Sequence, residues 1–268
     1  MKTLFCLADV HSFYDEMIGA LNEAGYDINN SDHIIIHCGD LLDRGPKPIE
    51  CLKFINNIPS NRKILIRGNH EDLLEEVFDR GKFLWHDIQN GTMKTIYKIA
   101  NIDRWENDFS DYMAITKCME NDEVKKYLNS LVDFFELENY IFVHGWLPEV
   151  GKDNLILSLK YDNWREGDWK KAGWLNGMEQ WSHGRIIKDK TIVCGHWHTS
   201  WGHSRLHNLG VEFKNKYNDS EKEEHFEPFI DKGIIALDQC VVYSGIMNCV
   251  VLEVADEEWD SRQFRPVY

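Results

Sequence analysis

Residues 33–45 read HIIIHCGDLLDRG, and this stretch decides how the rest of the chain is interpreted. The run from 33 to 38 predicts a buried strand, because it is rich in isoleucine and too short for an ordinary helix. The motif Gly-Asp-x-x-Asp-Arg-Gly, which contains Asp40 and Asp43, follows this run directly and covers residues 39–45. Because glycine permits a sharp exit from a strand, both aspartates are expected in a loop at the strand's carboxyl end.

The same arrangement occurs four more times along the chain. Apolar runs are followed at once by polar motifs after Leu4–Ala8 (Asp9-Val10-His11), Lys63–Ile66 (Arg67-Gly68-Asn69-His70-Glu71), Tyr140–Val143 (His144-Gly145) and Thr191–Cys194 (Gly195-His196-Trp197-His198). In open α/β sheets the loops at the carboxyl ends of strands gather in one crevice. One histidine at a strand end is ordinarily structural, but five such motifs in order point to a single shared site.

The fold class follows from the alternation of strand and helix patterns. Helical patterns cover Phe13–Ala24 and Pro46–Asn56, and further strand-like runs cover Gly233–Leu237 and Cys249–Glu253. This alternation predicts an α/β fold with parallel strands. Residues 71–139 show no convincing strand and are expected to form a helical insertion, whereas the charged stretch 215–227 is expected to be an exposed loop. Without repeats or flexible linkers, we expect a single domain over residues 1–268.

Composition limits the classes of function. The chain has 268 residues, a hydrophobic fraction of 43% and a formal charge of −15, so a core can form and non-specific binding to nucleic acid is disfavoured. The seven cysteines are scattered and form no CxxC pair, which predicts neither a disulfide framework nor a thiolate zinc site and favours a reducing cytoplasm. No apolar run reaches the ~20 residues of a membrane span, and the first one is too short for a signal peptide.

The donor atoms of the five motifs indicate the kind of metal site. Carboxylate, amide and imidazole ligands without thiolate suit manganese, iron, zinc or cobalt at a hydrolytic centre. The ligands are too many for one tetrahedral ion. Asp40, from its central motif, is therefore expected to bridge two divalent cations.

Together these motifs resemble those of the calcineurin-like metallophosphoesterases, and within them the PPP-type serine/threonine phosphatases and the symmetrical diadenosine tetraphosphatases. The stretch 235–252 also resembles the closing hairpin of that family. The resemblance covers nearly the whole chain. It implies a β-sandwich core flanked by helices, and two divalent cations, with manganese preferred over iron, zinc or cobalt.

The resemblance also implies residue roles, by position in the motifs. The first cation would be held by Asp9, His11 and Asp40, and the second by Asp40, Asn69, His144 and His196. His70 would be the general acid, oriented by Asp43, and Arg44 would bind the phosphoryl oxygens, with Asn69 also facing the substrate.

Some positions depart from the simplest PPP pattern. The fifth motif contains a second histidine, His198, where those phosphatases have Gly-His-Thr-Pro. In the wider superfamily such a histidine binds the first cation; a structural histidine is the alternative.

Arg165, in Asn-Trp-Arg-Glu, resembles a second phosphate-binding arginine, with a surface arginine as the alternative. Arg67 could reach phosphate or pair with a carboxylate, and the second role is preferred. Trp146 follows the fourth motif, where small residues are usual, so the pocket is expected to differ in shape.

These roles predict hydrolysis of a phosphate ester or anhydride by a hydroxide that bridges two cations, without a phosphoenzyme. A serine/threonine-type protein phosphatase or broad phosphomonoesterase is the first expectation. A symmetrical dinucleoside tetraphosphate hydrolase is the alternative, so the partner is a phosphorylated protein or a nucleotide. A binding module on an inactive phosphatase fold is the non-enzymatic alternative. The intact His70 and Asp43 argue against it.

Overall fold

The structure is a computed structural model, which describes residues 1–103, 111–148, 161–208, 225–260 and 263–266. Its strands are β1 (Lys2–Leu7), β2 (His33–His37), β3 (Lys63–Ile66), β4 (Leu131–Glu136), β5 (Tyr140–Phe142), β6 (Thr191–Cys194), β7 (Phe229–Asp231), β8 (Ile234–Ala236), β9 (Val250–Val254) and β10 (Gln263–Pro266). Its α-helices are α1 (Tyr14–Glu23), α2 (Pro48–Asn57), α3 (Asn69–Arg80), α4 (Trp85–Asn90), α5 (Thr92–Ala100), α6 (Asp111–Glu120), α7 (Asp122–Leu128), α8 (Trp169–Ala172), α9 (Gly177–Ser182), α10 (Thr199–Arg205), α11 (Val241–Ser244) and α12 (Asp256–Asp260). Two 3-10 turns, η1 (Ser60–Arg62) and η2 (Tyr161–Glu166), complete the elements.

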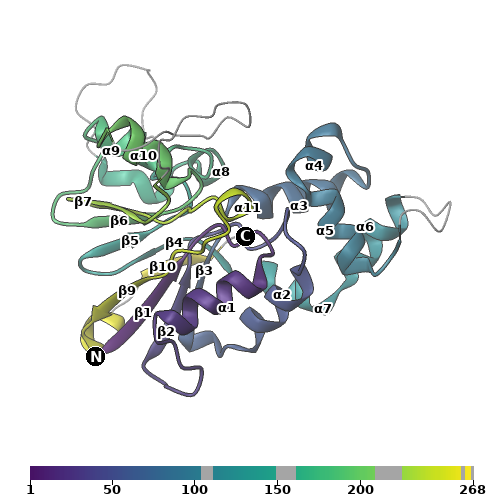
Figure 1. The fold of residues 1–268 in the computed structure, drawn as a ribbon, viewed down its shortest axis with the longest axis horizontal. Helices are drawn as coiled ribbons and strands as arrows, with labels where there is room; N and C mark the ends of the chain where they lie inside the picture. Colours follow the sequence, from purple (N-terminus) through teal and green to yellow (C-terminus); the bar gives the residue numbers. More distant parts are fainter. Residues whose placement is uncertain (104–110, 149–160, 209–224, 261–262, 267–268) are drawn as a thin grey trace.

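The strands form one sheet in the order β7-β8-β6-β5-β4-β3-β2-β1-β9, with β10 paired to β4 (Figure 1). Strands β1, β2 and β3 are parallel neighbours, as are β5, β6 and β8. The antiparallel pair β4–β5 joins these two halves. The predicted mixed α/β fold is confirmed, and each of the seven expected strands is present within one or two residues of its predicted bounds.

Three apolar clusters show how the layers pack. One cluster joins side chains of both halves of the sheet, such as Leu4 and Ile36 from one half and Phe142 and Val193 from the other. A second cluster lies under α1, α2 and the helices up to α7, and a third lies under α9 and α10. Figure 1 shows these two groups of helices on opposite sides of the strands. The two halves of the curled sheet therefore enclose a core, and helices cover their outer faces.

Local sequence explains the elements that precede the site. Helix α2 begins at Pro48, which suits the first helical turn, and buries Cys51, Leu52 and Ile55 on one face. In β2, Ile34 and Ile36 face the core between the halves while Ile35 faces the helices. Because both faces are covered, the three central residues of the strand are all apolar instead of alternating.

Two expectations about the fold need correction, and a third falls largely outside the described residues. The region 71–139 contains helices α3 to α7, but it also contains β4, which joins the two halves of the sheet. The stretch 235–252 does not form a hairpin, because β8 pairs with β6 while β9 pairs with β1 at the opposite edge. The predicted exposed loop at 215–227 lies largely outside the described residues, and Phe226 near its end is buried.

The burial of the cysteines and the character of the helices are two further features of the described residues. All seven cysteines are free, and five of them are buried, as expected for small apolar residues. Of the helices in the described ranges, none combines the length and the apolar character needed to cross a bilayer.

Candidate dinuclear metal site

The five predicted motifs lie together where β1, β2, β3, β5 and β6 end. The backbone N–H groups of Asp9 and His11 donate to the carbonyls of Gly39 and Asp40, at 3.0 Å each. The backbone N–H of His196 donates to Oδ2 of Asp9, at 2.9 Å. The exits of β1, β2 and β6 are therefore tied to one another, although they are far apart in sequence.

Asp40 lies at the centre of this cluster and is only 2% exposed. Its Oδ2 is 3.9 Å from Nε2 of His11 and 3.9 Å from Nε2 of His70, whereas its Oδ1 is 3.4 Å from Nε2 of His144. Two groups of donor atoms, each compact enough to hold a metal ion, share this carboxylate: His11, Asp40 and His70, and Asp40, His144 and His196. Each oxygen of Asp40 thus faces a different candidate site, as a bridging carboxylate requires.

Two of the imidazoles are oriented by main-chain carbonyls. Nδ1 of His11 donates to the carbonyl of Leu42 at 2.9 Å, and Nδ1 of His144 donates to the carbonyl of Cys38 at 2.8 Å. A histidine that ligates a metal is held in this way by a hydrogen bond at its other ring nitrogen. In both residues Nε2 is therefore the atom turned toward Asp40.

Asn69 lies close to two members of the second group, His144 and Asp40. Nε2 of His144 is 2.8 Å from Oδ1 of Asn69, besides its 3.4 Å separation from Oδ1 of Asp40. Burial lowers the pKa of His144, but the charges of Asp40 and Asp9 and its hydrogen bonds outweigh burial and raise the pKa to about 10. A proton on Nε2 of His144 lies close to the oxygen atoms of Asn69 and Asp40. A divalent cation in its place could be bound by the same three side chains. The donor set therefore fits the cations that the motifs predict.

Asp9 and His198 occupy neighbouring positions outside these two groups. Asp9 is buried, and its pKa lies well above its usual range, first because of burial and then because of the charge of Asp238. His198 is half-buried, and its Nδ1 is hydrogen-bonded to the hydroxyl of Ser200 at 2.7 Å. Ligation of a cation by either residue stays a prediction.

His70 and Asp43 form a hydrogen-bonded pair beside Asp40. Nδ1 of His70 donates to Oδ2 of Asp43 at 2.7 Å, and the hydroxyl of Thr92 donates to the same oxygen at 2.6 Å. Burial lowers the pKa of His70, but the carboxylates of Asp40 and Asp43 outweigh burial and raise it. Nε2 of His70 can thus hold a proton at the edge of the cluster. Thr92 begins α5, so the helical insertion supplies one member of this arrangement.

Arg44 reaches into the first group. Its Nη1 donates to Nε2 of His11 at 2.9 Å, and its Nη2 donates to Nε2 of His70 at 3.1 Å. Burial lowers the pKa of His11, and the Arg44 charge lowers it further. A protonated Nε2 on His70 would repel the guanidinium. Arg44 can therefore donate to His70 only while the His70 ring is neutral. It can donate to His11 only while no cation is bound at Nε2 of His11.

The other two arginines lie in ion pairs. Arg165 donates from Nε and Nη2 to the carboxylate of Glu136, at 2.8 Å and 2.6 Å. Glu136 pairs with Ile141, the middle residue of β5, so Arg165 is held at a strand position three residues before His144. A phosphate contact of Arg165 stays a prediction. Arg67 pairs with Asp72, at 3.2 Å, and with Glu75, which is the role preferred from the sequence.

Backbone strain is concentrated in the predicted site. Six of its residues have positive φ, which is uncommon outside glycine: Asp9 (53°), His11 (48°), Asp40 (59°), Asp43 (73°), Arg44 (59°) and His196 (68°). Strained residues of this kind persist only where surrounding contacts hold them, and they cluster at functional sites. Glycine at 68 is one reason that the loops fit, because an added Cβ there would overlap the Asp40 carboxylate.

Glu71 is a positioning residue that the sequence analysis did not single out. Its Oε2 accepts from the backbone N–H groups of Asp40 and Gly68, at 3.0 and 2.8 Å. Its Oε1 accepts from the backbone N–H of Leu41 and the hydroxyl of Tyr127, at 3.0 and 2.8 Å. The buried carboxylate thus fixes the loop that carries Asp40. Its place in the Gly-Asn-His-Glu motif was the available signal.

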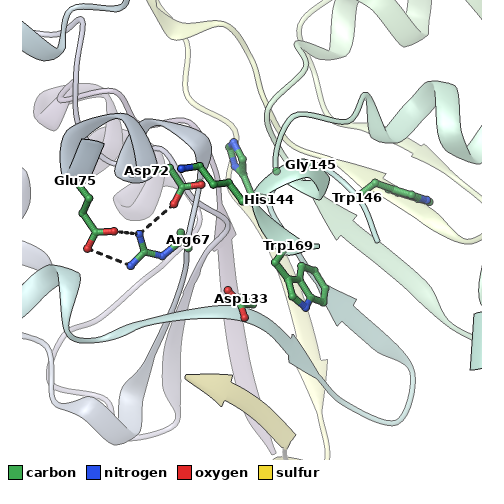
Figure 2. A pocket seen from close by; sticks show the side chains of 11 residues that line it. Arg67, Asp72, Glu75, Asp133, His144, Gly145, Trp146 and Trp169 are labelled. Atoms are coloured by element: carbon green, nitrogen blue, oxygen red, sulfur yellow. Dashed lines mark hydrogen bonds and ion pairs between the residues drawn. The ribbon is translucent and has the colours of Figure 1, made fainter. Parts of the chain in front are cut away.

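A pocket of about 280 Å³ adjoins the centre on the side of His144 (Figure 2). The exit of β3, the first turns of α3 and the segment around α8 supply most of its walls. Figure 2 shows Arg67 turned toward Asp72 and Glu75, with Trp169 across the pocket. Trp146 and Trp164 are almost fully buried in the third apolar cluster, and Trp146 also lines this pocket.

Comparison with known proteins agrees with this geometry. The family profile described as "Calcineurin-like phosphoesterase" matches residues 2–229. The chain belongs to the calcineurin-like phosphoesterase family. Membership supports the predicted phosphoric ester hydrolase and implies divalent cations, for which the two donor groups around Asp40 are candidate ligand sets.

Several relatives are named bis(5'-nucleosyl)-tetraphosphatases, some symmetrical and others asymmetrical. A symmetrical bis(5'-nucleosyl)-tetraphosphatase of Buchnera aphidicola is 34% identical over 71 residues, or 26% of this chain and 24% of the relative. An asymmetrical bis(5'-nucleosyl)-tetraphosphatase of Bacillus velezensis is 32% identical over 71 residues, or 24% of this chain and 28% of the relative. A symmetrical one of Xylella fastidiosa is 21% identical over 241 residues, or 74% and 78%. The match to the first two thus spans about a quarter of their length.

Among solved structures, a mutant of a cold-active protein tyrosine phosphatase superposes with a TM-score of 0.52 and 15% sequence identity. The match covers 99% of this chain and 80% of the other. At this identity the likeness concerns the fold alone.

Proposed function

We propose that this chain hydrolyses phosphoric esters or anhydrides with two divalent cations held on either side of Asp40. The observation that carries the proposal is the orientation of the Asp40 carboxylate, whose Oδ2 faces His11 and His70 while Oδ1 faces His144. Asp9 and His198 would complete the first site, and Asn69 and His196 the second. Manganese is the first choice for both.

The chain's own residues suggest how the reaction proceeds. Bound divalent cations would act as Lewis acids and activate a water molecule for attack on phosphorus. Arg44 would leave its contacts with His11 and His70 and donate to the phosphoryl oxygens, where negative charge increases in the transition state. Nε2 of His70 would then release a proton to the leaving oxygen while Asp43 holds Nδ1.

The names of the relatives favour a dinucleoside tetraphosphate as substrate. A phosphomonoester, such as a phosphorylated serine or threonine, is the second candidate. The pairing of His70 with Asp43 favours it, because an alkoxide leaving group needs a proton donor more than a phosphate does. The free cysteines support the expected cytoplasmic location.

The test is product analysis with diadenosine tetraphosphate, a phosphoserine peptide and p-nitrophenyl phosphate, after EDTA and after addition of Mn²⁺. We expect activity to disappear with EDTA and return with Mn²⁺, and a symmetric cut to release only ADP. Asp40→Asn should lose activity on every substrate together with metal binding. Turnover that persists in EDTA, or in Asp40→Asn, would exclude the proposed centre.

A further inference from the structure

The segment from α8 to Trp174 lies beside the candidate metal site and is fixed to its walls. The carbonyl of Ala172 accepts from the backbone N–H of Trp146 at 3.1 Å. Nζ of Lys170 pairs with Oε1 of Glu76, on α3, at 2.6 Å. At Gly173 an added Cβ would lie 3.9 Å from the backbone nitrogen of Asn69. The position of Trp174 is therefore set by the same elements that carry the candidate ligands.

Trp174 touches one of those ligands but leaves much of its indole in solvent. Its ring centroid lies 5.7 Å from that of His196, in an edge-to-face arrangement, and the backbone of Trp174 is hydrogen-bonded to the His196 ring. Yet Trp174 is 48% exposed, whereas Trp146 and Trp164 are 1% and 2% exposed. A half-exposed indole thus lies directly beside a candidate ligand of the proposed phosphoryl site.

The chemistry of this surface favours one class of substrate. An indole face binds flat aromatic rings by stacking and burial of apolar surface. A nucleotide carries such a ring on a flexible arm attached to its phosphates, whereas a phosphorylated serine or threonine carries none. Every nucleobase offers a π-face, so stacking selects for a base without reading which base it is.

We propose that Trp174 is the platform on which a nucleobase of the substrate stacks while the attached phosphate chain lies over the Asp40 centre. This inference rests on the proposed function and specifies its substrate as a nucleoside polyphosphate. The leaving group of such a substrate is itself a nucleotide. Trp174 acts on binding, and it takes no part in proton transfer.

Trp174→Ala tests the platform without removing the backbone contact to His196. Hydrolysis of diadenosine tetraphosphate is compared with that of inorganic tripolyphosphate, which has the same anhydride bonds and no base. We expect kcat/KM for the dinucleotide to fall roughly 5- to 150-fold, the range for loss of one stacked base, mainly through KM. Tripolyphosphate hydrolysis should fall much less than hydrolysis of the dinucleotide, since tripolyphosphate makes no stacking contact. Trp174→Phe should restore most of the loss.

Trp85→Ala is the matched control, because Trp85 on α4 is a more exposed indole (70%). It should leave the ratio of the two activities unchanged. Equal losses on both substrates in Trp174→Ala, or no loss on either, would overturn the platform.

Binding of ADP by equilibrium dialysis with Mn²⁺ keeps the two proposals separate. A wild-type protein that hydrolyses neither substrate would refute the proposed function. Weaker ADP binding by Trp174→Ala than by the wild type would still support the platform, and equal or undetectable binding would refute it.

Discussion

Replacement of His37 by leucine should stabilise the protein, and more so as the pH falls. His37 ends β2, lies between Leu7 and Leu65 in the sheet and is 0% exposed. Neither of its ring nitrogens has a hydrogen-bond partner among the described residues. A buried polar group without a partner costs about 1–3 kcal/mol. Leucine has a similar volume and no polar atom, so His37→Leu should raise the free energy of unfolding by about that amount at pH 7.

The pH dependence follows from the pKa of the ring. Burial lowers the pKa of His37 from 6.5 to about 3. Below about pH 6.5 the unfolded chain therefore binds a proton that the folded chain excludes, and this favours unfolding. The stability that depends on the neutral ring is present above pH 6.5 and decreases as the pH falls toward 3. Between pH 7 and pH 5 the difference amounts to about 2 kcal/mol.

Urea unfolding in EDTA, followed by tryptophan fluorescence at pH 7 and pH 5, measures both effects. EDTA removes any cation, so the other buried histidines titrate alike in the two proteins. The wild type should lose about 2 kcal/mol more than His37→Leu over this range. His183→Leu, at an exposed position, is the control and should behave as the wild type. Equal pH dependence in wild type and His37→Leu, or destabilisation by leucine at pH 7, would refute the reasoning.

Three further predictions concern the proposed reaction. His70→Ala should keep its bound metal and lose a factor of about 10²–10⁴ in rate on an alkyl phosphate. The loss on p-nitrophenyl phosphate should be much smaller, because its leaving group barely needs a proton. Equal losses on the two substrates would refute the role of His70 as proton donor. Arg44→Ala should bind Mn²⁺ more tightly in calorimetry, because a guanidinium no longer donates to His11. Its KM should rise about 10- to 100-fold from the lost charge-assisted contacts to phosphate, and weaker Mn²⁺ binding would contradict this view. Thr92→Val removes the hydroxyl bonded to Asp43, so kcat on an alkyl phosphate should fall up to about 10-fold. A fall of the same size on p-nitrophenyl phosphate would show that Thr92 does not act through the proton donor.

The sequence predicted most of the sheet but missed the strand that connects its halves. Strand β4 reads LVDFFE, in which Asp133 interrupts a short apolar run directly after a long helical region. Such a run cannot be separated from a buried helix by periodicity alone. Strands β7 and β10 have three and four residues. They read FID and QFRP, so unlike the equally short β5 (YIF) and β8 (IIA) they contain charged residues and show no clear apolar run.

The residues of the candidate site were easier to predict than their environment. The rule that strand ends converge was enough to expect Asp40 near His11 and His144. The pairing of Arg165 with Glu136 could not be anticipated, because Glu136 lies in the strand that the sequence did not reveal. Likewise, nothing local distinguishes Trp174 from the other nine tryptophans, since its exposure beside His196 depends on the folded chain.

The contrast between the buried centre and its exposed border bears on where substrate preference arises. Asp40 is fixed by its strained backbone and by the contacts of Glu71 with its own N–H and that of Leu41. A centre held this firmly presents the same geometry to any phosphoryl group. It cannot distinguish a nucleotide from a phosphopeptide, because the two differ only beyond the phosphate. Discrimination must then come from exposed side chains around the centre, and Trp174 is an aromatic residue that contacts a candidate ligand and remains open to solvent.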